Sequence, residues 1–239
     1  MLTETLARTD WSEVNARLSG AHPKEILQWA VETFYPKLTM ATAFGPEGCL
    51  IIQMLSEIEP RVRVFNLDTG YQFAETLELR DKIAEKYGIE VELVRADTTV
   101  EQYETIHGGP LYVKNPDQCC FDRKIVPLRW AVEGYDAWIS SIRADQSSQR
   151  SKASLVGWDP KFNLVKINPL LGWTKRDVWA YVVSREVPYN PLHDQGYPSI
   201  GCWPCTRAVG VGETDERAGR WAGQAKTECG LHSLDSSQL

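Results

Sequence analysis

Short apolar runs alternate with longer periodic segments over the first two thirds of the chain. Runs of strand length that are rich in apolar and β-branched residues predict buried strands at residues 38–43, 61–67, 90–95, 137–142 and 164–167. Between them, apolar residues recur at helical spacing, which predicts helices at 49–58 and 73–86, the second ended by Gly88. The stretch 12–33 predicts two further short helices before the first strand.

This alternation of strands and helices implies a doubly wound, mostly parallel sheet of the α/β class. In such sheets ligands bind beyond the carboxyl ends of the strands, at the point where the strand order reverses. Three polar turns follow predicted strands here, at Phe44–Gly48, Asp68–Gly70 and Arg143–Arg150. Together these turns predict a nucleotide pocket.

The pattern changes after about Thr206, where the chain is rich in Gly, Arg, Glu and Ser and has no long apolar pattern. We therefore expect one nucleotide-binding domain over residues 1–205, followed by a flexible tail over residues 206–239. The tail is predicted to be poorly ordered without a ligand, as gating segments often are.

Composition narrows the function classes. The 239 residues are 43% hydrophobic and 24% charged, as is usual for a globular enzyme. A net charge of −6 argues against nucleic-acid binding, which needs a basic surface. No run approaches the ~20 apolar residues of a membrane helix, and the first residues resemble neither a signal nor a transit peptide. We therefore expect no membrane association and a cytoplasmic location, where cysteines serve metals or catalysis more often than disulfides.

Four of the six cysteines form two pairs, Cys119-Cys120 and Cys202-x-x-Cys205. Four thiolates that converge on one site suit zinc or an iron–sulfur cluster. Adjacent cysteines approach a single zinc ion awkwardly, whereas the larger body of a cubane lets neighbouring residues reach different irons. The pattern therefore favours iron–sulfur, with zinc as the alternative. Cys49 lies in an apolar run and is expected in the core.

Cys229 stands near the end of the predicted tail, where a cysteine packs nothing and is open to oxidation. Gly230 gives the backbone room to approach a ligand, and His232 can supply a proton or a hydrogen bond. Upstream, Arg217 and Arg220 are spaced to bind sulfate or phosphate oxygens. Taken alone, Cys229 could equally be an incidental exposed thiol, and the two arginines could belong to a solvated surface. Their combination favours an anion-binding site with a nucleophile.

These residues together resemble the sulfonucleotide reductase family, which comprises the adenylyl-sulfate and phosphoadenylyl-sulfate reductases. The resemblance runs from about residue 25 to the end of the chain. Its matching segments are TAFGPEG (42–48), LDTG (67–70), CCFDRKIVPL (119–128), IRADQSSQR (142–150), NPLLGWTKRDVWAY (168–181), GCWPCT (201–206), ERAGRW (216–221) and ECGLH (228–232).

The resemblance implies the adenine nucleotide alpha-hydrolase-like fold, which the family shares with ATP pyrophosphatases, and a role for each matching residue. The implied catalytic residues are the nucleophile Cys229, with His232 and Lys124. The implied substrate-binding residues are Thr42, Ala43, Phe44, Gly45, Leu67, Thr69, Gly70, Arg143, Asp145, Gln146, Arg217 and Arg220, with Arg150 on the same loop. The implied ligands of a [4Fe-4S] cluster are Cys119, Cys120, Cys202 and Cys205.

The implied activity is reduction of adenylyl sulfate (APS) to sulfite and AMP through an S-sulfocysteine on Cys229, as part of assimilatory sulfate reduction and cysteine synthesis. Thioredoxin or glutaredoxin would be the reductant, and the family implies a homo-oligomer. The paired cysteines are typical of the branch that uses APS. The alternatives are a phosphoadenylyl-sulfate (PAPS) reductase, an ATP pyrophosphatase-type adenylating enzyme and a zinc-bound interaction module. The FGPEG loop lacks the serines and the aspartate that the pyrophosphatases use to hold pyrophosphate.

Overall fold

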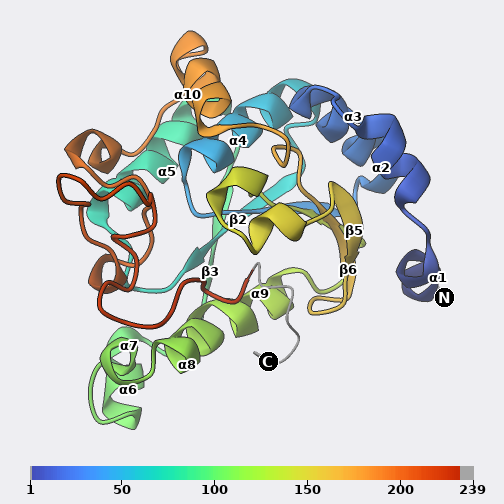
Figure 1. Cartoon of the computed structure of the whole chain (residues 1–239). Coiled ribbons are helices and arrows are strands. Elements are labelled where there is room, and N and C mark those ends of the chain that lie inside the picture. The colour runs from blue at the N-terminus through green and yellow to red at the C-terminus, as the bar shows by residue number, and fades with distance from the viewer. Residues whose placement is uncertain (1, 232–239) are drawn as a thin grey trace.

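A six-stranded sheet forms the centre of the computed structural model, which describes residues 2–231 (Figure 1). The strand order is β3-β2-β1-β4-β6-β5. The strands are β1 (Leu38–Thr42), β2 (Arg63–Asp68), β3 (Val91–Arg95), β4 (Ala137–Ile139), β5 (Val156–Asp159) and β6 (Leu164–Ile167). Every neighbouring pair is parallel except β5 and β6, which are antiparallel. The mostly parallel, doubly wound sheet predicted from the sequence is confirmed.

The strand order reverses between β1 and β4. Met40 of β1 is paired with Val64 of β2 on one side and with Ile139 of β4 on the other. The chain leaves β1 toward β2 and β3, and later returns to build β4 and β6 on the opposite side. Loops that leave neighbouring strands in opposite directions open a crevice at the carboxyl ends.

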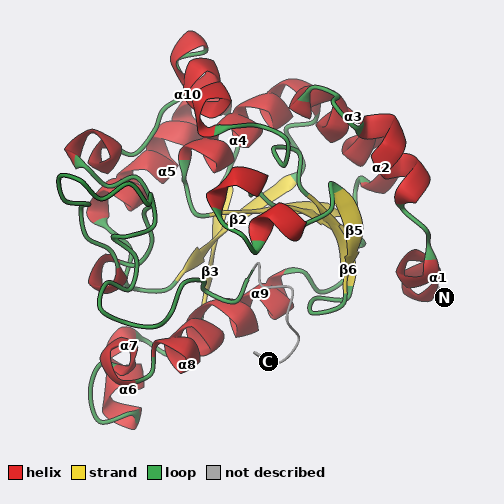
Figure 2. Ribbon diagram, viewed as in Figure 1, coloured by secondary structure: helices red, strands yellow, loops and turns green. Residues whose placement is uncertain are grey.

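Helices cover both faces of the sheet (Figure 2). They are α1 (Leu2–Arg8), α2 (Ser12–Leu18), α3 (Pro23–Phe34), α4 (Pro46–Ile58), α5 (Ala74–Tyr87), α6 (Val100–Ile106), α7 (Leu111–Lys114), α8 (Pro116–Cys120), α9 (Val126–Ala131) and α10 (Lys175–Ser184). A π-helical turn, Phe121–Ile125, joins α8 to α9. No helix among residues 2–231 has both the length and the apolar character needed to cross a bilayer.

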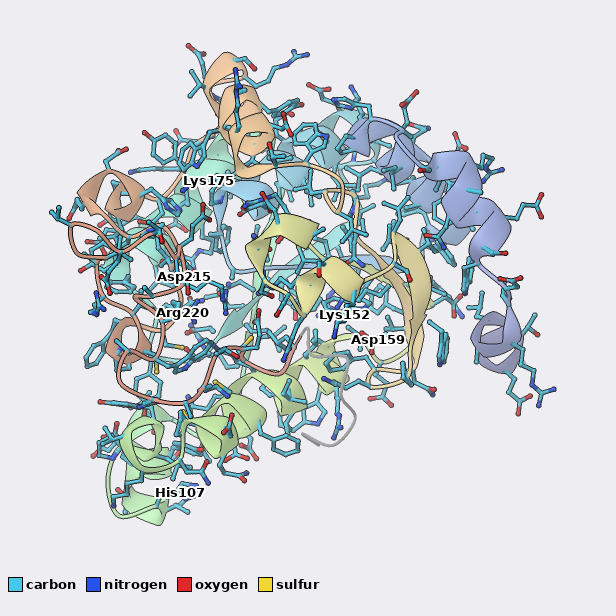
Figure 3. All side chains as sticks on the ribbon, in the orientation of Figure 1. His107, Lys152, Asp159, Lys175, Asp215 and Arg220 are labelled. Atoms are coloured by element: carbon cyan, nitrogen blue, oxygen red, sulfur yellow. The ribbon has the colours of Figure 1, made fainter. Side chains whose placement is uncertain are left out.

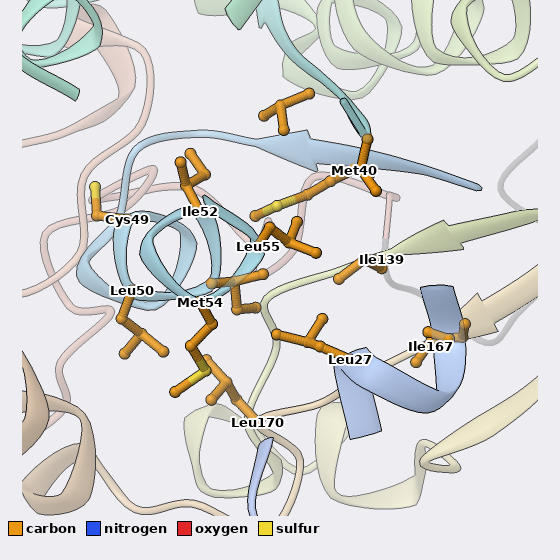
Figure 4. Packing of buried hydrophobic residues seen from close by; sticks show 14 of the residues in the cluster. Leu27, Met40, Cys49, Leu50, Ile52, Met54, Leu55, Ile139, Ile167 and Leu170 are labelled. Atoms are coloured by element: carbon orange, nitrogen blue, oxygen red, sulfur yellow. The ribbon is translucent and has the colours of Figure 1, made fainter. Parts of the chain in front are cut away.

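Strand alternation divides the core into two layers, because successive side chains point to opposite faces. Val64 and Ile139 pack with α3, α4, α5 and α10 on one face. Their neighbours Phe65 and Trp138 pack with α9 on the other face. Cys49 is fully buried in the first layer, where burial raises the pKa of its thiol to about 12. Its expected place in the core is confirmed (Figure 4).

Leu55 of α4 tests the first core layer. Its side chain is fully buried in the same cluster as Met40, Ile139 and Leu27 (Figure 4). We expect Leu55→Ala to lower the free energy of unfolding by about 2–5 kcal/mol, because the loss of buried apolar surface and the cavity left behind both destabilise the fold. Urea denaturation measures this. Val183→Ala, at a position that is 71% exposed, should change that free energy by less than about 0.5 kcal/mol.

Candidate active site

A cavity of about 220 Å³ opens at the carboxyl ends of the strands. Here the loops after β1, β2 and β4 meet residues 206–231, which we call the C-terminal segment. This is the edge at which the three polar turns predicted a pocket. Most of the residues proposed from the sequence line it: Thr42, Ala43, Gly45, Leu67, Thr69, Lys124, Gln146, Arg150, Arg217, Arg220, Cys202 and Cys229. The segments that carry them are far apart in sequence, and the switch in strand order brings them together.

The charges around this cavity favour an anion. Four side chains in its lining are permanent or near-permanent cations, namely Lys124, Arg150, Arg217 and Arg220. Two are carboxylates, and each has a cation of its own: Glu47 pairs with Arg143, and Glu216 lies 2.9 Å from the Lys175 ammonium. Arg150 and Arg217 share the single carboxylate of Glu228, so the balance still leaves cationic groups for a sulfate or phosphate.

Arg143 lies behind the cavity wall and is not part of its lining. Its side chain is 3% exposed and pairs with Glu47, and its Nε donates to Asp145 Oδ1 at 2.8 Å. Gln146 Nε2 also donates to Glu47, at 3.2 Å. The structure thus places the predicted binding residues Arg143 and Asp145 in an ion-pair network around the buried Arg143 guanidinium, which joins the loops after β1 and β4.

Phe44 and Gly70 also lie outside the lining. Phe44 is buried in the core, with a positive φ of 55° that turns the chain from β1 into α4. Gly70, at φ 74°, packs against Val100 and the guanidinium of Arg123. Both shape the loops and leave the contacts with a ligand to their neighbours. His232, the remaining predicted catalytic residue, lies outside the described residues.

The four paired cysteines surround a second, smaller cavity beside the first, together with Thr69, Tyr71, Tyr112, Arg123 and Lys124. Cys119 and Cys120 end α8, while Cys202 precedes the 3-10 turn Trp203–Cys205 and Cys205 ends it. Burial raises the pKa of Cys119 to about 12, and the other three thiols add to the effect. Within residues 2–231, no three side chains of the His, Cys, Asp and Glu types are arranged to hold a metal ion.

Lys124 borders both cavities. It lies in the π-helical turn that follows the adjacent cysteines, which aims its side chain between the two sites. Burial lowers the pKa of Lys124, but the thiols of Cys202, Cys120 and Cys229 more than offset this, so the pKa is raised. The ammonium is therefore kept charged between the paired cysteines and Cys229.

Cys229 is partly buried and faces the main cavity. Burial raises the pKa of the Cys229 thiol, and the Glu228 carboxylate also raises it. The Lys124 ammonium, the Leu231 amide and Arg150 lower this pKa, and the balance lies below the ordinary value. A lowered pKa increases the thiolate fraction, and the thiolate is the nucleophilic form. Cys229 therefore has the environment of a reactive cysteine.

The described part of the predicted tail, residues 206–231, packs against the domain. Trp221 and Glu228 are buried, and residues Thr206 and Arg220 form an antiparallel bridge. The Arg220 guanidinium lies 4.5 Å from the centre of the Trp221 ring, and Figure 3 labels Arg220 on this segment. The buried Trp221 ring thus anchors this part of the chain.

Arg123 is a second residue that sequence reasoning missed. It is 4% exposed, and its Nε donates to the carbonyl of Thr69 at 2.6 Å. Its guanidinium also lies over the rings of Tyr103, at 5.1 Å, and Tyr71, at 5.6 Å. It thus fixes the loop after β2 to the cysteine-bearing helix. The available signal in the sequence was an arginine three residues after the two adjacent cysteines.

Gly201 allows Arg220 to approach the cavity wall. A Cβ at this position would lie 2.2 Å from Nη2 of Arg220. We expect Gly201→Ala to displace that guanidinium and weaken anion binding about tenfold or more, because an oriented charged hydrogen bond is lost. Isothermal titration with AMP and sulfate measures the change. Gly172→Ala, where a Cβ meets nothing within 4 Å, should leave binding unchanged; equal affinities for both variants would contradict the expectation.

Comparison with known proteins shows similarity to reductases of phosphosulfate nucleotides. The family model described as "Phosphoadenosine phosphosulfate reductase domain" matches residues 37–208. The chain is 47% identical to a phosphoadenosine 5′-phosphosulfate reductase of Gloeobacter violaceus, covering 88% of each chain. It is 42% identical to an adenosine 5′-phosphosulfate reductase of Salinibacter ruber, covering 94% of this chain and 89% of the relative.

Solved structures agree with the fold. A Candida auris phosphoadenylyl-sulfate reductase in a phosphate complex superposes with a TM-score of 0.72 and 33% identity, over 82% of this chain and 95% of the other. The FMN adenylyltransferase of Candida glabrata superposes with a TM-score of 0.54 at 14% identity, over 84% and 68% of the two chains. The second likeness shows the fold alone. The family and the nucleotide-binding fold expected from the sequence are both confirmed.

Proposed function

Since the chain belongs to the phosphoadenosine phosphosulfate reductase family, we propose that it reduces adenylyl sulfate to sulfite and AMP, with Cys229 as the nucleophile. The observation that carries this proposal is the shared cavity. Cys229, Lys124 and three arginines all line one space at the switch point of the sheet. A thiol with a lowered pKa thus faces a site that is suited to an adenosine with two linked anionic groups.

The chemistry needs two electrons and one reactive thiol. The Cys229 thiolate attacks the sulfur of APS, the bond from that sulfur to the phosphate oxygen breaks, and AMP leaves with the bonding pair. An S-sulfocysteine results. One thiolate of a protein dithiol then attacks Cys229 Sγ and expels sulfite, and the second thiol closes the reductant's disulfide and frees Cys229. A thioredoxin has the reducing power for this exchange, and a glutaredoxin is the alternative reductant.

The cations in the cavity make the first step possible. An anionic thiolate and the anionic phosphosulfate repel each other, and the AMP oxygen gains charge as the bond breaks. Arg217 and Arg220 reach the cavity from the C-terminal segment, while Arg150 and Lys124 reach it from the domain. Oriented cations that need no rearrangement during the reaction are the largest source of such stabilisation.

The four paired cysteines fit a [4Fe-4S] cluster as a further part of this proposal. None of the four forms a disulfide, and all four surround one cavity. Two of them are adjacent on a short helix. A single ion would need three or four donors at one point, whereas a cubane takes thiolates from separate directions. When bound, the cluster would place negative charge next to Lys124 and would hold Pro116–Cys120 to the turn Trp203–Cys205.

APS is favoured over PAPS by the cysteine pairs, which resemble those of the APS-using branch. The relatives include reductases named for either substrate, so PAPS is the second candidate. A competitive turnover assay with equal concentrations of both substrates decides between them. An ATP pyrophosphatase-type activity is disfavoured, because Glu47 brings a carboxylate to the start of α4, where those enzymes hold pyrophosphate.

The proposed function is tested by mixing the reduced protein with APS alone and measuring its mass. We expect the mass of one sulfonate group on the peptide that contains Cys229, with release of AMP. Addition of thioredoxin should remove the adduct and yield sulfite. No adduct on Cys229 would refute the proposed mechanism.

The cluster is tested independently by colour. Anaerobically purified protein should be brown, with about four irons and four sulfides per chain, and Cys120→Ser should lose that absorbance. A colourless wild-type protein that contains zinc would contradict the cluster. The proposed homo-oligomeric state follows from the family resemblance and is tested by light scattering. The proposed cytoplasmic location follows from the sequence of the first residues and the apolar pattern, and cell fractionation tests it.

A further inference from the structure

Glu228 is a buried carboxylate directly before Cys229, and the reaction described above gives it no part. Its side chain is 5% exposed. Arg150 donates to it from Nε at 3.1 Å and from Nη2 at 3.2 Å, and Arg217 donates from Nη2 at 3.1 Å. Ser147 Oγ donates at 3.3 Å. A carboxylate this buried is tolerated because it is paired on both sides.

The two arginines come from different parts of the chain. Arg150 belongs to the loop after β4, which is fixed to the sheet, and Arg217 belongs to the C-terminal segment. Glu228 lies between them and so joins the segment to the domain one residue before the nucleophile. Both arginines line the main cavity, but Glu228 does not. The carboxylate is therefore behind the arginines, on the side away from the ligand space.

Two further ties lie on either side of this one. Lys161 Nζ donates to the carbonyl of Gly230 at 2.6 Å, one residue after Cys229. Lys226 pairs with Asp117 at the start of α8. Cys229 is thus held from both directions along the chain, and Glu228 supplies the tie with the most donors.

We propose that Glu228 is a positioning residue for the proposed reaction: its carboxylate locks Arg150 and Arg217 in place and holds Cys229 against the cavity. A carboxylate that takes up Nε and Nη2 of Arg150 fixes the plane of that guanidinium, because both groups are planar and bidentate. The remaining N–H groups of both arginines are then aimed at the phosphosulfate. Opening the segment for the reductant requires this carboxylate to leave its two partners.

The proposal rests on the proposed function for its catalytic part, but the closed position of Cys229 is measurable without any substrate. Two maleimides with the same reactive group serve as probes, one small and one linked to a bulky polymer. Their rate ratio at Cys229, followed by peptide mass, reports access and is independent of the thiol pKa, which alters both rates equally. We expect Glu228→Gln to raise the relative rate of the bulky probe about tenfold or more, because charged hydrogen bonds are lost.

Glu213→Gln is the matched control. It makes the same chemical change in the same segment, at an exposed carboxylate that pairs with Arg207 at 2.7 Å, and it should leave the ratio unchanged. Glu228→Asp keeps the charge with a shorter reach and should fall between the wild type and Glu228→Gln. Circular dichroism shows whether each variant is folded.

The catalytic part is measured by the rate of adduct formation on Cys229 at increasing APS concentrations. We expect Glu228→Gln to lower the maximal rate about tenfold or more, and Glu228→Asp to recover part of it. An unchanged probe ratio would overturn the proposal. So would a lower KM with an unchanged maximal rate, since that would make Glu228 a competitor of the substrate for the arginines. If the wild type forms no adduct while the probe ratio still rises in Glu228→Gln, the proposed function fails and the positional role stands.

Discussion

Replacing Cys229 by serine is expected to lower sulfite formation by at least about a thousandfold. The serine hydroxyl has no appreciable anionic form at neutral pH, and it cannot form the sulfur–sulfur bond that carries the sulfonate to the reductant. Serine is close to cysteine in size and leaves the cations of the cavity lining in place, so AMP should still bind. Turnover assays with thioredoxin and titration with AMP measure the two properties.

The control is a comparison of the folded variant with the wild-type protein. The variant's iron content, absorbance and unfolding midpoint should match the wild type, because Cys229 contributes little to the core. Sulfite formation within tenfold of the wild-type rate would contradict the role of Cys229 as nucleophile. The mass of the variant after mixing with APS gives a second check, since the sulfonate adduct should be missing.

Replacing Lys124 by methionine is expected to slow adduct formation about a hundredfold. Methionine keeps much of the length and volume of the side chain but removes the buried charge between the paired cysteines and Cys229. Loss of one oriented donor to a developing charge typically has an effect of this size. Rapid-quench measurement of the adduct tests it. Lys152→Met, an exposed position on the nearby loop, should retain the wild-type rate.

The same variant has a signature in its pH profile. Lys124 is one of the groups that hold the pKa of Cys229 below its ordinary value. The thiolate is the reacting form, so the rate falls as the pH drops through that pKa. Without the ammonium the pKa rises, and the falling limb of the profile should move to higher pH. A slower variant with an unmoved limb would show that Lys124 acts on the substrate alone.

The central strands were predictable because each is short, apolar and bounded by turn residues. The first and last residues of four strands lie within two residues of the ranges expected from the sequence; these strands are β1, β2, β3 and β6. Strand β4 is shorter than expected and ends at Ile139. Beyond it, the Ser140 amide still donates to the Ile167 carbonyl at 2.9 Å, and the Ser140 hydroxyl donates to Asn168 Oδ1 at 2.6 Å. β5 was missed because an antiparallel edge strand needs no continuous apolar run.

The helices around the cysteine pairs were missed for a different reason. Residues 100–131 form four short helices and a π turn, broken by Pro110, Pro116 and Pro127. Segments this short carry too few turns for a periodic pattern to appear. α10 had a detectable start, because Thr174 and Asp177 form a capping box.

The site was only partly predictable, because a sequence does not show which charges pair with one another. Cys229, Lys124, Arg217 and Arg220 do line the cavity, as their motifs indicated. In the sequence, Arg143 is equally suited to bind an anion. In the folded chain it forms an ion pair with Glu47, which is nearly a hundred residues away in sequence. Glu228 was read only as part of a motif, and its two arginine partners become visible only in the folded chain.

The order in which the chain is made has a consequence for its thiol. The last strand of the sheet ends at Ile167, while Cys229 comes near the end of the chain. At typical ribosomal rates of ~5–20 residues per second, the nucleophile is synthesised about 3–12 seconds after the sheet is complete. A nascent chain can therefore complete its sheet before it carries the proposed nucleophile, and a chain that terminates before Cys229 should form no sulfonate adduct.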